Sequence, residues 1–429
     1  MSNLNSENYE ITELENGIRI ISEHIPYFRS ISLGIWVASG SRGECCDLNG
    51  ITHLIEHLVF KGSKKRSNKD IAIEFDSIGA DFNAFTDKEN SCFYCDFIDT
   101  HLDKCTELLF DVVLNPSFLQ EHLDTEKKII LEEIKMVEDT PSEDIFNYYY
   151  ELVLNSHPLS LPILGTRKSL QNISVKDVWE YFNKRFVFKN IVVSAAGNIK
   201  HNELVEAVRK NIDSLVLNGI NEKGIIEKEE PKIKPGLKIV KKKIKSTNIC
   251  YGGIGCRRSS IDRYPLTVLM NIVGGSMSSR LFQKIREDMG LVYSVFAGNT
   301  QYTDTGVIDI YAASDSKNIG KVIKIIEEEI SDIKKNSVSE VELQRAKENI
   351  KGEIVLNIEE ISSRMFRFGK SLLIDNKVLP IDDILNKIDL VCIRDIYEIS
   401  NKYFESGRKN VAILGEVSRE IAKELRWKG

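Results

Sequence analysis

Apolar and polar residues alternate over the first forty positions and then recur every three to four residues in several longer stretches. Alternation predicts strands, and the longer period predicts amphipathic helices. A hairpin is expected to turn at Glu15-Asn16-Gly17, because an Asn-Gly pair favours a tight turn. The remaining predictions are strands over residues 30–39, 81–86 and 91–98, and helices over residues 49–60, 69–78, 101–114, 118–138 and 143–154.

The order of these elements predicts an α+β fold, because the strands are separated by helices at irregular intervals. A helix-then-strand unit recurs in the chain: residues 177–186 and 190–197 resemble residues 395–404 and 410–415. Two copies of one unit indicate a duplicated domain.

A charged stretch with two prolines separates the two halves. We therefore expect an N-terminal domain over residues 1–217, a linker with the first strand of the second half over 218–245, and a homologous C-terminal domain over 246–429. Within the linker, residues 238–245 alternate lysine with isoleucine and valine. That pattern predicts an exposed edge strand protected by charge.

Composition excludes several classes of protein. With 42% hydrophobic and 28% charged residues, the 429-residue chain has a globular composition. A net charge of −6 argues against a nucleic-acid partner. No apolar run approaches the ~20 residues of a membrane helix, and the polar first residues lack the pattern of an export signal. We expect a cytoplasmic protein with no membrane partner.

Eight cysteines in a chain of this length are too sparse for a disulfide scaffold, so reduced thiols are expected. Cys92 and Cys95 form a Cys-x-x-Cys pair, but the alternating pattern around them places the two on opposite faces of a strand. A redox or zinc site there is therefore disfavoured. The adjacent Cys45 and Cys46 lie in a loop and suggest no function.

The sequence His53-Leu54-Ile55-Glu56-His57 is the sharpest chemical signal. On a helix, positions i, i+3 and i+4 share one face, so both imidazoles and the carboxylate converge. Two histidines at this spacing can bind one zinc ion, with the glutamate as general base. The alternative is a pair of surface histidines beside a glutamate.

Catalytic zinc takes three protein ligands, and the predicted helix over residues 118–138 offers the third. The residues one turn either side of Glu133 are apolar, which predicts a buried carboxylate in need of a cation. Glu132 has lysines at i−4 and i+3, typical of a solvated face. Glu126 lies on nearly the same face as Glu133 and is expected to support the site, although a partly exposed helix charge is the alternative.

These residues predict zinc-dependent hydrolysis. Zinc lowers the pKa of its water toward ~7 and polarises a carbonyl. Glu56 is then placed to take the water proton and to deliver it to the leaving amine. The prediction is a metalloendopeptidase with one zinc ion per chain.

The inverted motif, with a glutamate 76 positions after His57, resembles the insulinase/pitrilysin family of zinc metallopeptidases, and within it the bacterial relatives of the mitochondrial processing peptidase β subunit. The resemblance covers nearly the whole chain. Its motifs are the stretches 50–62, 83–89, 126–141, 157–166 and 274–283.

The resemblance implies a role for each matching residue. It implies His53, His57 and Glu133 as zinc ligands, with Glu56 and Glu126 as catalytic glutamates. It further implies substrate binding by residues that motif reasoning alone does not select, namely Asn83 and Ala84 on an edge strand and Arg286 and Tyr293 in the second half. Taken by themselves, that arginine and tyrosine suggest a helix cap and a core residue.

The same resemblance implies fold and assembly. Each half is expected to be a mostly antiparallel sheet packed by helices, and two chains are expected to form a homodimer around an enclosed chamber. Substrates are then unfolded peptides or presequence-like segments. The alternative is a non-catalytic or partner-dependent subunit of a processing-peptidase-like complex, since some relatives keep the fold and lose the site.

Overall fold

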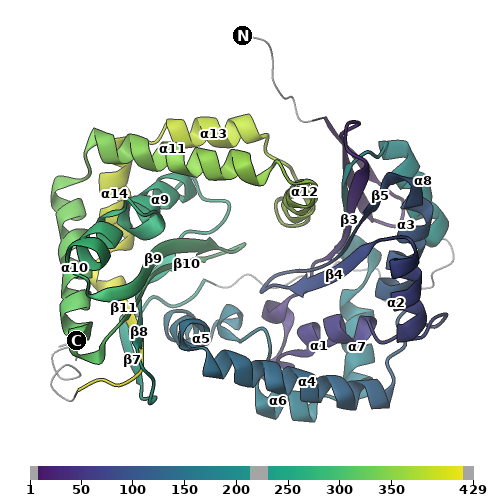
Figure 1. Ribbon diagram of the computed structural model, residues 1–429, viewed down its shortest axis with the longest axis horizontal. Coiled ribbons are helices and arrows are strands. Elements are labelled where there is room, and N and C mark those ends of the chain that lie inside the picture. Colours follow the sequence, from purple (N-terminus) through teal and green to yellow (C-terminus); the bar gives the residue numbers. More distant parts are fainter. Residues whose placement is uncertain (1–7, 213–229, 419–429) are drawn as a thin grey trace, which may run out of the picture. The chain divides into compact units, whose positions relative to one another are not determined.

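The computed structural model describes residues 8–212 and 230–418, and the chain divides into two compact units (Figure 1). The first unit takes residues 1–134, 161–227 and 355–381; the second takes residues 135–160, 228–354 and 382–429. Each half of the sequence thus gives one segment to the unit formed mainly by the other half. Residues 218–229 of the predicted linker lie outside the described residues.

The first unit is built on a six-stranded sheet in the order β1-β2-β6-β3-β5-β4. Only the β2–β6 pair is parallel, and β4 is an edge strand. The strands are β1 (Tyr9–Glu13), β2 (Arg19–His24), β3 (Ser30–Val37), β4 (Asp81–Thr86), β5 (Ser91–Ile98) and β6 (Ile191–Gly197).

Helices cover both faces of this sheet. On one face most of the helices share a single apolar core with the strands. On the other face α12 is the one α-helix, among the described residues, that packs on β3 and β6 (Figure 1). The approach of α12 is close, because a Cβ atom added to Gly369 would lie 1.9 Å from Trp36 Nε1. The helices are α1 (Ile51–Val59), α2 (Asn68–Ser77), α3 (Leu102–Leu114), α4 (Gln120–Asp139, to residue 134), α6 (Arg167–Asn172), α7 (Val175–Arg185), α8 (His201–Ile212) and α12 (Ile361–Asp375).

The second unit repeats this plan on a five-stranded sheet in the order β7-β11-β8-β10-β9. The β7–β11 pair is parallel and the other pairs are antiparallel. The strands are β7 (Gly236–Val240), β8 (Thr247–Gly255), β9 (Val292–Gln301), β10 (Gly306–Ser314) and β11 (Asn410–Leu414).

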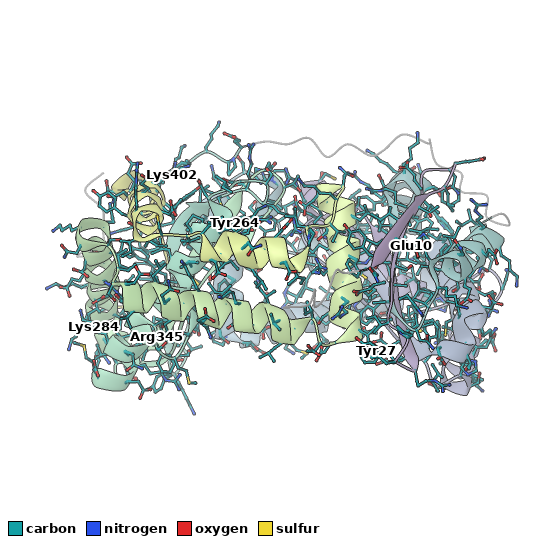
Figure 2. All side chains as sticks on the ribbon, turned by 90° about the horizontal axis from the view of Figure 1, so that it is seen from above. Glu10, Tyr27, Tyr264, Lys284, Arg345 and Lys402 are labelled. Atoms are coloured by element: carbon teal, nitrogen blue, oxygen red, sulfur yellow. The ribbon has the colours of Figure 1, made fainter. Side chains whose placement is uncertain are left out.

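Here α5 is the one α-helix of the described residues on one face, and the remaining α-helices share the core on the other. Figure 2 shows Tyr264 of α9, whose ring lies 5.4 Å from the Lys387 ammonium of α13. α11 and α13 run side by side, with Lys347 donating to the Asp389 carbonyl at 2.9 Å. The helices are α5 (Pro141–Leu154), α9 (Arg263–Met270), α10 (Ile319–Asn336), α11 (Glu340–Asn357), α13 (Ile381–Asp389) and α14 (Ile393–Tyr403).

The α+β prediction is confirmed, and the repeated helix-then-strand unit corresponds to α7–β6 and α14–β11. Cys92 and Cys95 face the two different cores of the first unit, as the alternation predicted. The predicted strand over 238–245 is wrong in extent: β7 ends at Val240, because its parallel partner β11 ends at Leu414. Among the described helices, none is both long and apolar enough to cross a bilayer.

Candidate metal centre

The short helix α1 carries both histidines of the motif. Its apolar side chains, among them Leu54, Ile55 and Leu58, are buried in the core of the first unit. That burial fixes the rotation of the helix, so the opposite face presents His53, Glu56 and His57 as half-buried side chains.

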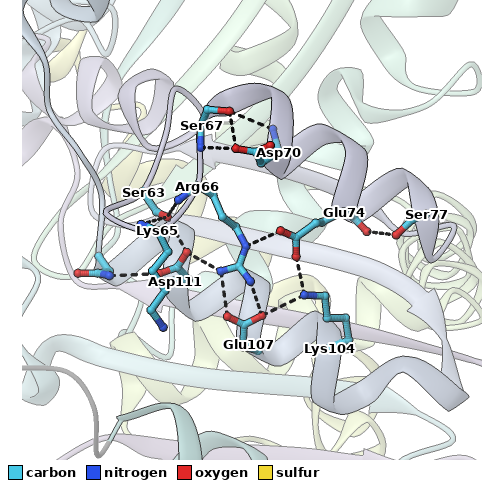
Figure 3. Close-up of polar contacts among 11 residues, drawn as sticks. Ser63, Lys65, Arg66, Ser67, Asp70, Glu74, Ser77, Lys104, Glu107 and Asp111 are labelled. Atoms are coloured by element: carbon cyan, nitrogen blue, oxygen red, sulfur yellow. Dashed lines mark hydrogen bonds and ion pairs between the residues drawn. The ribbon is translucent and has the colours of Figure 1, made fainter.

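The segment that follows α1 is tied to two neighbouring helices through one arginine (Figure 3). Arg66 donates to Glu74 of α2 at 2.8 Å and to Asp111 of α3 at 2.7 Å. It also forms a bidentate ion pair with Glu107 of α3, with hydrogen bonds of 2.8 and 2.9 Å. Ser63 also donates to Asp111, at 2.6 Å. These carboxylates around one guanidinium fix the position of the segment that follows the C-terminus of α1.

Three side chains from α1 and α4 bring one donor atom each to a common place, all within 4.8 Å of one another: His53, His57 and Glu133. His57 Nε2 lies 3.5 Å from Glu133 Oε1, and His53 Nε2 lies 3.9 Å from Glu133 Oε2. A tetrahedral zinc ion holds its ligand atoms roughly 3–4 Å apart. The predicted ligand set is therefore assembled at a separation that suits zinc.

Glu126 lies behind His57. Its Oε2 atom is 2.9 Å from His57 Nδ1, and Lys61 Nζ is 2.8 Å from its Oε1. A carboxylate there selects the tautomer with a proton on Nδ1, which leaves the Nε2 lone pair facing Glu133. Two acceptors then face each other at 3.5 Å, an arrangement that a cation between them satisfies.

His53 is the more buried of the two histidines, with 12% of its side chain exposed. Burial, and to a lesser degree the charge of His57, lowers its pKa to about 3, so the ring is neutral near pH 7. A neutral imidazole is the form that binds a metal. Among the described residues, its Nδ1 atom has no hydrogen-bond partner.

Glu56 points from the same helix toward the end of β4, where the Thr86 hydroxyl donates to its Oε2 atom. Burial raises the pKa of Glu56, and the hydrogen bond from Thr86 lowers it. A raised pKa suits a general base that must take and return a proton near neutral pH.

The edge strand β4 carries Asn83, which is exposed, and Ala84, which is half-buried. The Asn83 side-chain oxygen accepts the N–H of Ala84 at 2.8 Å. An edge strand offers unpaired backbone groups to an added strand. A peptide that joins this edge must displace that side chain from the Ala84 amide.

Arg286 and Tyr293 lie in the second unit and both are exposed. The Arg286 guanidinium lies 4.6 Å from the centre of the Phe282 ring, and the Tyr293 hydroxyl donates to Asp315 at 3.1 Å. Tyr293 is therefore not a core residue, and Arg286 is not buried. Their predicted role in substrate binding stays a prediction.

The burial predicted for Glu133 on α4 is wrong. Glu133 keeps 33% of its side chain exposed, and its neighbours Ile129 and Met136 are exposed, at 40% and 68%. Glu126 is the buried one, with 2% of its side chain exposed. The buried stripe of α4 runs through Leu123, Glu126, Ile130 and Ile134. Sequence reasoning also missed Lys61, Thr86 and Glu44, which hold the motif side chains or the start of α1.

Comparison with known proteins finds similarity to peptidases over nearly the whole chain. Residues 19–167 match the family model described as insulinase (peptidase family M16), and residues 172–350 match the one described as peptidase M16 inactive domain. A Bacillus subtilis relative, the uncharacterized zinc protease YmxG, is 34% identical over 91% of this chain and 94% of its own. An uncharacterized zinc protease of Mycobacterium leprae is 32% identical over 97% of this chain and 94% of its own.

Two crystal structures share the fold. A protease from Helicobacter pylori superposes with a TM-score of 0.88 at 21% identity, covering 95% of this chain and 99% of its own. A peptidase M16 inactive domain from Pseudomonas fluorescens superposes with a TM-score of 0.87 at 18% identity, covering 96% and 98%.

Proposed function

The chain belongs to the insulinase family of peptidases, family M16, and on that premise we propose that it is a zinc-dependent endopeptidase acting on unfolded peptides or presequence-like segments. The observation that carries the proposal is the grouping of His53, His57 and Glu133, with Glu56 on the same helix face. Relatives that cover nearly the whole chain are named zinc proteases, which supports the same activity.

Each residue of the candidate site has its own part in the proposed reaction. His53, His57 and Glu133 would hold the zinc ion, one per chain, and Glu126 would orient His57 through the hydrogen bond to its Nδ1 atom. Zinc bound there supplies Lewis-acid chemistry, polarising the peptide carbonyl and making water more acidic. Glu56 takes the proton of the attacking water and passes it to the leaving nitrogen, which completes hydrolysis of the peptide bond.

The substrate enters as an extended chain. Strand addition at β4, next to Asn83 and Ala84, aligns a backbone of any sequence beside Glu56, because main-chain hydrogen bonds carry the affinity. Arg286 and Tyr293 are proposed to hold the substrate from the second unit. The backbone of a folded protein is mostly paired in its own structure, so we expect folded proteins not to be cleaved.

The test is a mixed peptide library incubated with the purified chain and read by mass spectrometry, with and without a chelator. We expect cleavage that the chelator abolishes and that added zinc restores. Glu56→Gln should lower the rate by about 10²–10⁴-fold with zinc still bound. Chelator-resistant cleavage, or a Glu56→Gln protein as fast as wild type, contradicts the proposal.

A second candidate is a non-catalytic or partner-dependent subunit. One observation favours it: the model that matches residues 172–350 describes an inactive domain. An activity assay of the purified chain distinguishes the two candidates. A non-catalytic or partner-dependent subunit would bind peptides and zinc but would not cleave peptides alone. A cytoplasmic location and the lack of nucleic-acid or membrane partners stay predictions from composition.

A further inference from the structure

A buried carboxylate from the loop before α1 reaches the first turn of that helix. Glu44, 8% exposed, accepts the N–H of Gly50 at 2.7 Å and the side-chain amide of Asn49 at 2.8 Å on one oxygen. Its other oxygen accepts the N–H of Thr52 at 2.8 Å. One side chain thus satisfies two backbone donors that the helix itself cannot pair.

Helix α1 has no cap of its own. It begins after Gly50, whose φ of +93° is left-handed and which has no side chain to offer. The first N–H groups of a helix need an acceptor, and the positive end of its dipole favours an anion. Glu44 supplies both, from six positions before Gly50.

The cap is in turn anchored in the first unit. Asn49, which binds Glu44, also donates to the Pro162 carbonyl at 2.9 Å, and its own carbonyl accepts Ser169 at 2.7 Å. The buried ammonium of Lys88 donates to the Leu161 carbonyl and interacts with the charge of Glu44. Burial raises the pKa of Glu44 to about 7, so the carboxylate is ionised at pH 8.

The two histidine ligands differ in what orients them. His57 is held through its ring, because Nδ1 faces Glu126 at 2.9 Å. The His53 ring has no such partner among the described residues, since its Nδ1 atom is buried and unpaired. His53 is the third residue of α1 and directly follows Thr52, so the backbone that places its ring is the turn that Glu44 holds.

We propose that Glu44 is a positioning residue of the metal site, which fixes His53 through the first turn of α1 as Glu126 fixes His57 through its ring. The inference rests on the proposed zinc site. It does not need the chain to hydrolyse peptides, and zinc affinity tests it directly.

The experiment measures the zinc dissociation constant by competition with a chromogenic chelator at pH 8. Glu44→Gln keeps the shape of the side chain but turns an N–H₂ group toward the donors. Loss of a supporting hydrogen bond costs metal sites about 10–100-fold in affinity, so Glu44→Gln should weaken zinc binding by at least tenfold. The matched control is Asp70→Asn, which removes the carboxylate that accepts from Ser67 at the start of α2.

A double variant distinguishes weaker zinc binding from a general loss of stability. Glu44→Gln removes one of the two carboxylates, Glu44 and Asp87, whose charges act on the buried Lys88 ammonium. The double variant Glu44→Gln/Lys88→Met should therefore recover thermal stability while zinc binding stays weak.

The outcomes separate the readings. The proposal is supported if zinc affinity falls in Glu44→Gln and in Glu44→Gln/Lys88→Met, while the zinc dissociation constant of Asp70→Asn stays within twofold of wild type. A lower melting temperature with unchanged zinc affinity makes Glu44 a plain helix cap, and an equal loss in Asp70→Asn makes the effect general destabilisation; either overturns it. A wild-type chain that binds zinc and cleaves nothing refutes the proposed function and leaves this comparison intact.

Discussion

Side chains that are distant from the motif in the sequence but contact it in the fold decide how its residues can act. Glu126 gives His57 its tautomer, and Thr86 donates a hydrogen bond to the proposed base Glu56. Such partners typically matter almost as much as the ligands, because a ligand that is free to turn loses affinity. The spacing to Glu133 predicts Glu126, whereas no pattern in the sequence indicates Thr86.

The Thr86 hydroxyl should set the acidic limit of activity. Thr86→Val removes a hydrogen bond that lowers the pKa of Glu56, so that pKa rises further. A base must be ionised to act, so the acidic limb of kcat/KM against pH should move to higher pH. Thr86→Ser keeps the hydroxyl and should retain the wild-type profile. A Thr86→Val profile that stays in place or moves to lower pH contradicts this.

A buried carboxylate in the second unit should make stability depend on pH. Burial raises the pKa of Asp309, 7% exposed, to about 6, above the ordinary 3.8 of the unfolded chain. The folded state then binds the proton more tightly, so the contribution of Asp309 to stability is fully present below pH 4 and is lost as pH rises through 6. Asp309→Asn should gain up to about 3 kcal/mol over wild type at pH 8 and nothing at pH 4, measured by urea unfolding. An equal difference at both pH values contradicts the assignment.

At the scale of residues, the sequence predicts which side chains can bind a metal better than it predicts how buried each of them is. The spacing of His53, Glu56 and His57 follows from helix geometry and holds in α1. The apolar neighbours of Glu133 on α4 predict that its side chain is buried. Which face of α4 is buried depends on tertiary packing, however, and the packing buries the face that carries Glu126. Glu44 could not be found, since it contacts backbone N–H groups that every sequence has.

At the level of elements, one α-helix of the described residues covers one face of each sheet. α12 does this in the first unit and α5 in the second, and each comes from the half of the sequence that forms mainly the other unit. Hydrophobic periodicity predicted α5 nearly to its ends, from 143 to 154 against Pro141–Leu154. It could not predict which sheet the helix covers, because an apolar stripe fits any apolar face.

The seat of α12 on β3 should depend on Gly369. A Cβ atom there would lie 1.9 Å from Trp36 Nε1, and the overlap must push the helix off the sheet. Gly369→Ala should destabilise the first unit by about 1–3 kcal/mol, measured by chemical unfolding. Gly352 of α11 has nothing within 4 Å of its added Cβ, so Gly352→Ala should be neutral or stabilising by up to about 1 kcal/mol. Equal effects of the two changes contradict the close approach.

At the scale of the whole molecule, the chain has two units of one plan, and we propose that two chains complete an enclosed chamber. Light scattering should then give twice the 48.8 kDa of one chain. Peptides should be cleaved and their folded parent proteins spared, because a closed chamber excludes folded chains. A monomer with full activity contradicts the assembly and leaves the zinc site untouched.

The central claim is that α1 and α4 together hold one zinc ion, and metal content after dialysis tests it most directly. Elemental mass spectrometry should find about one zinc per chain in wild type and in Glu56→Gln, because the base is not a ligand. His57→Ala and Glu133→Gln should lose most of it. A Glu133→Gln protein that keeps a full zinc ion per chain contradicts the account.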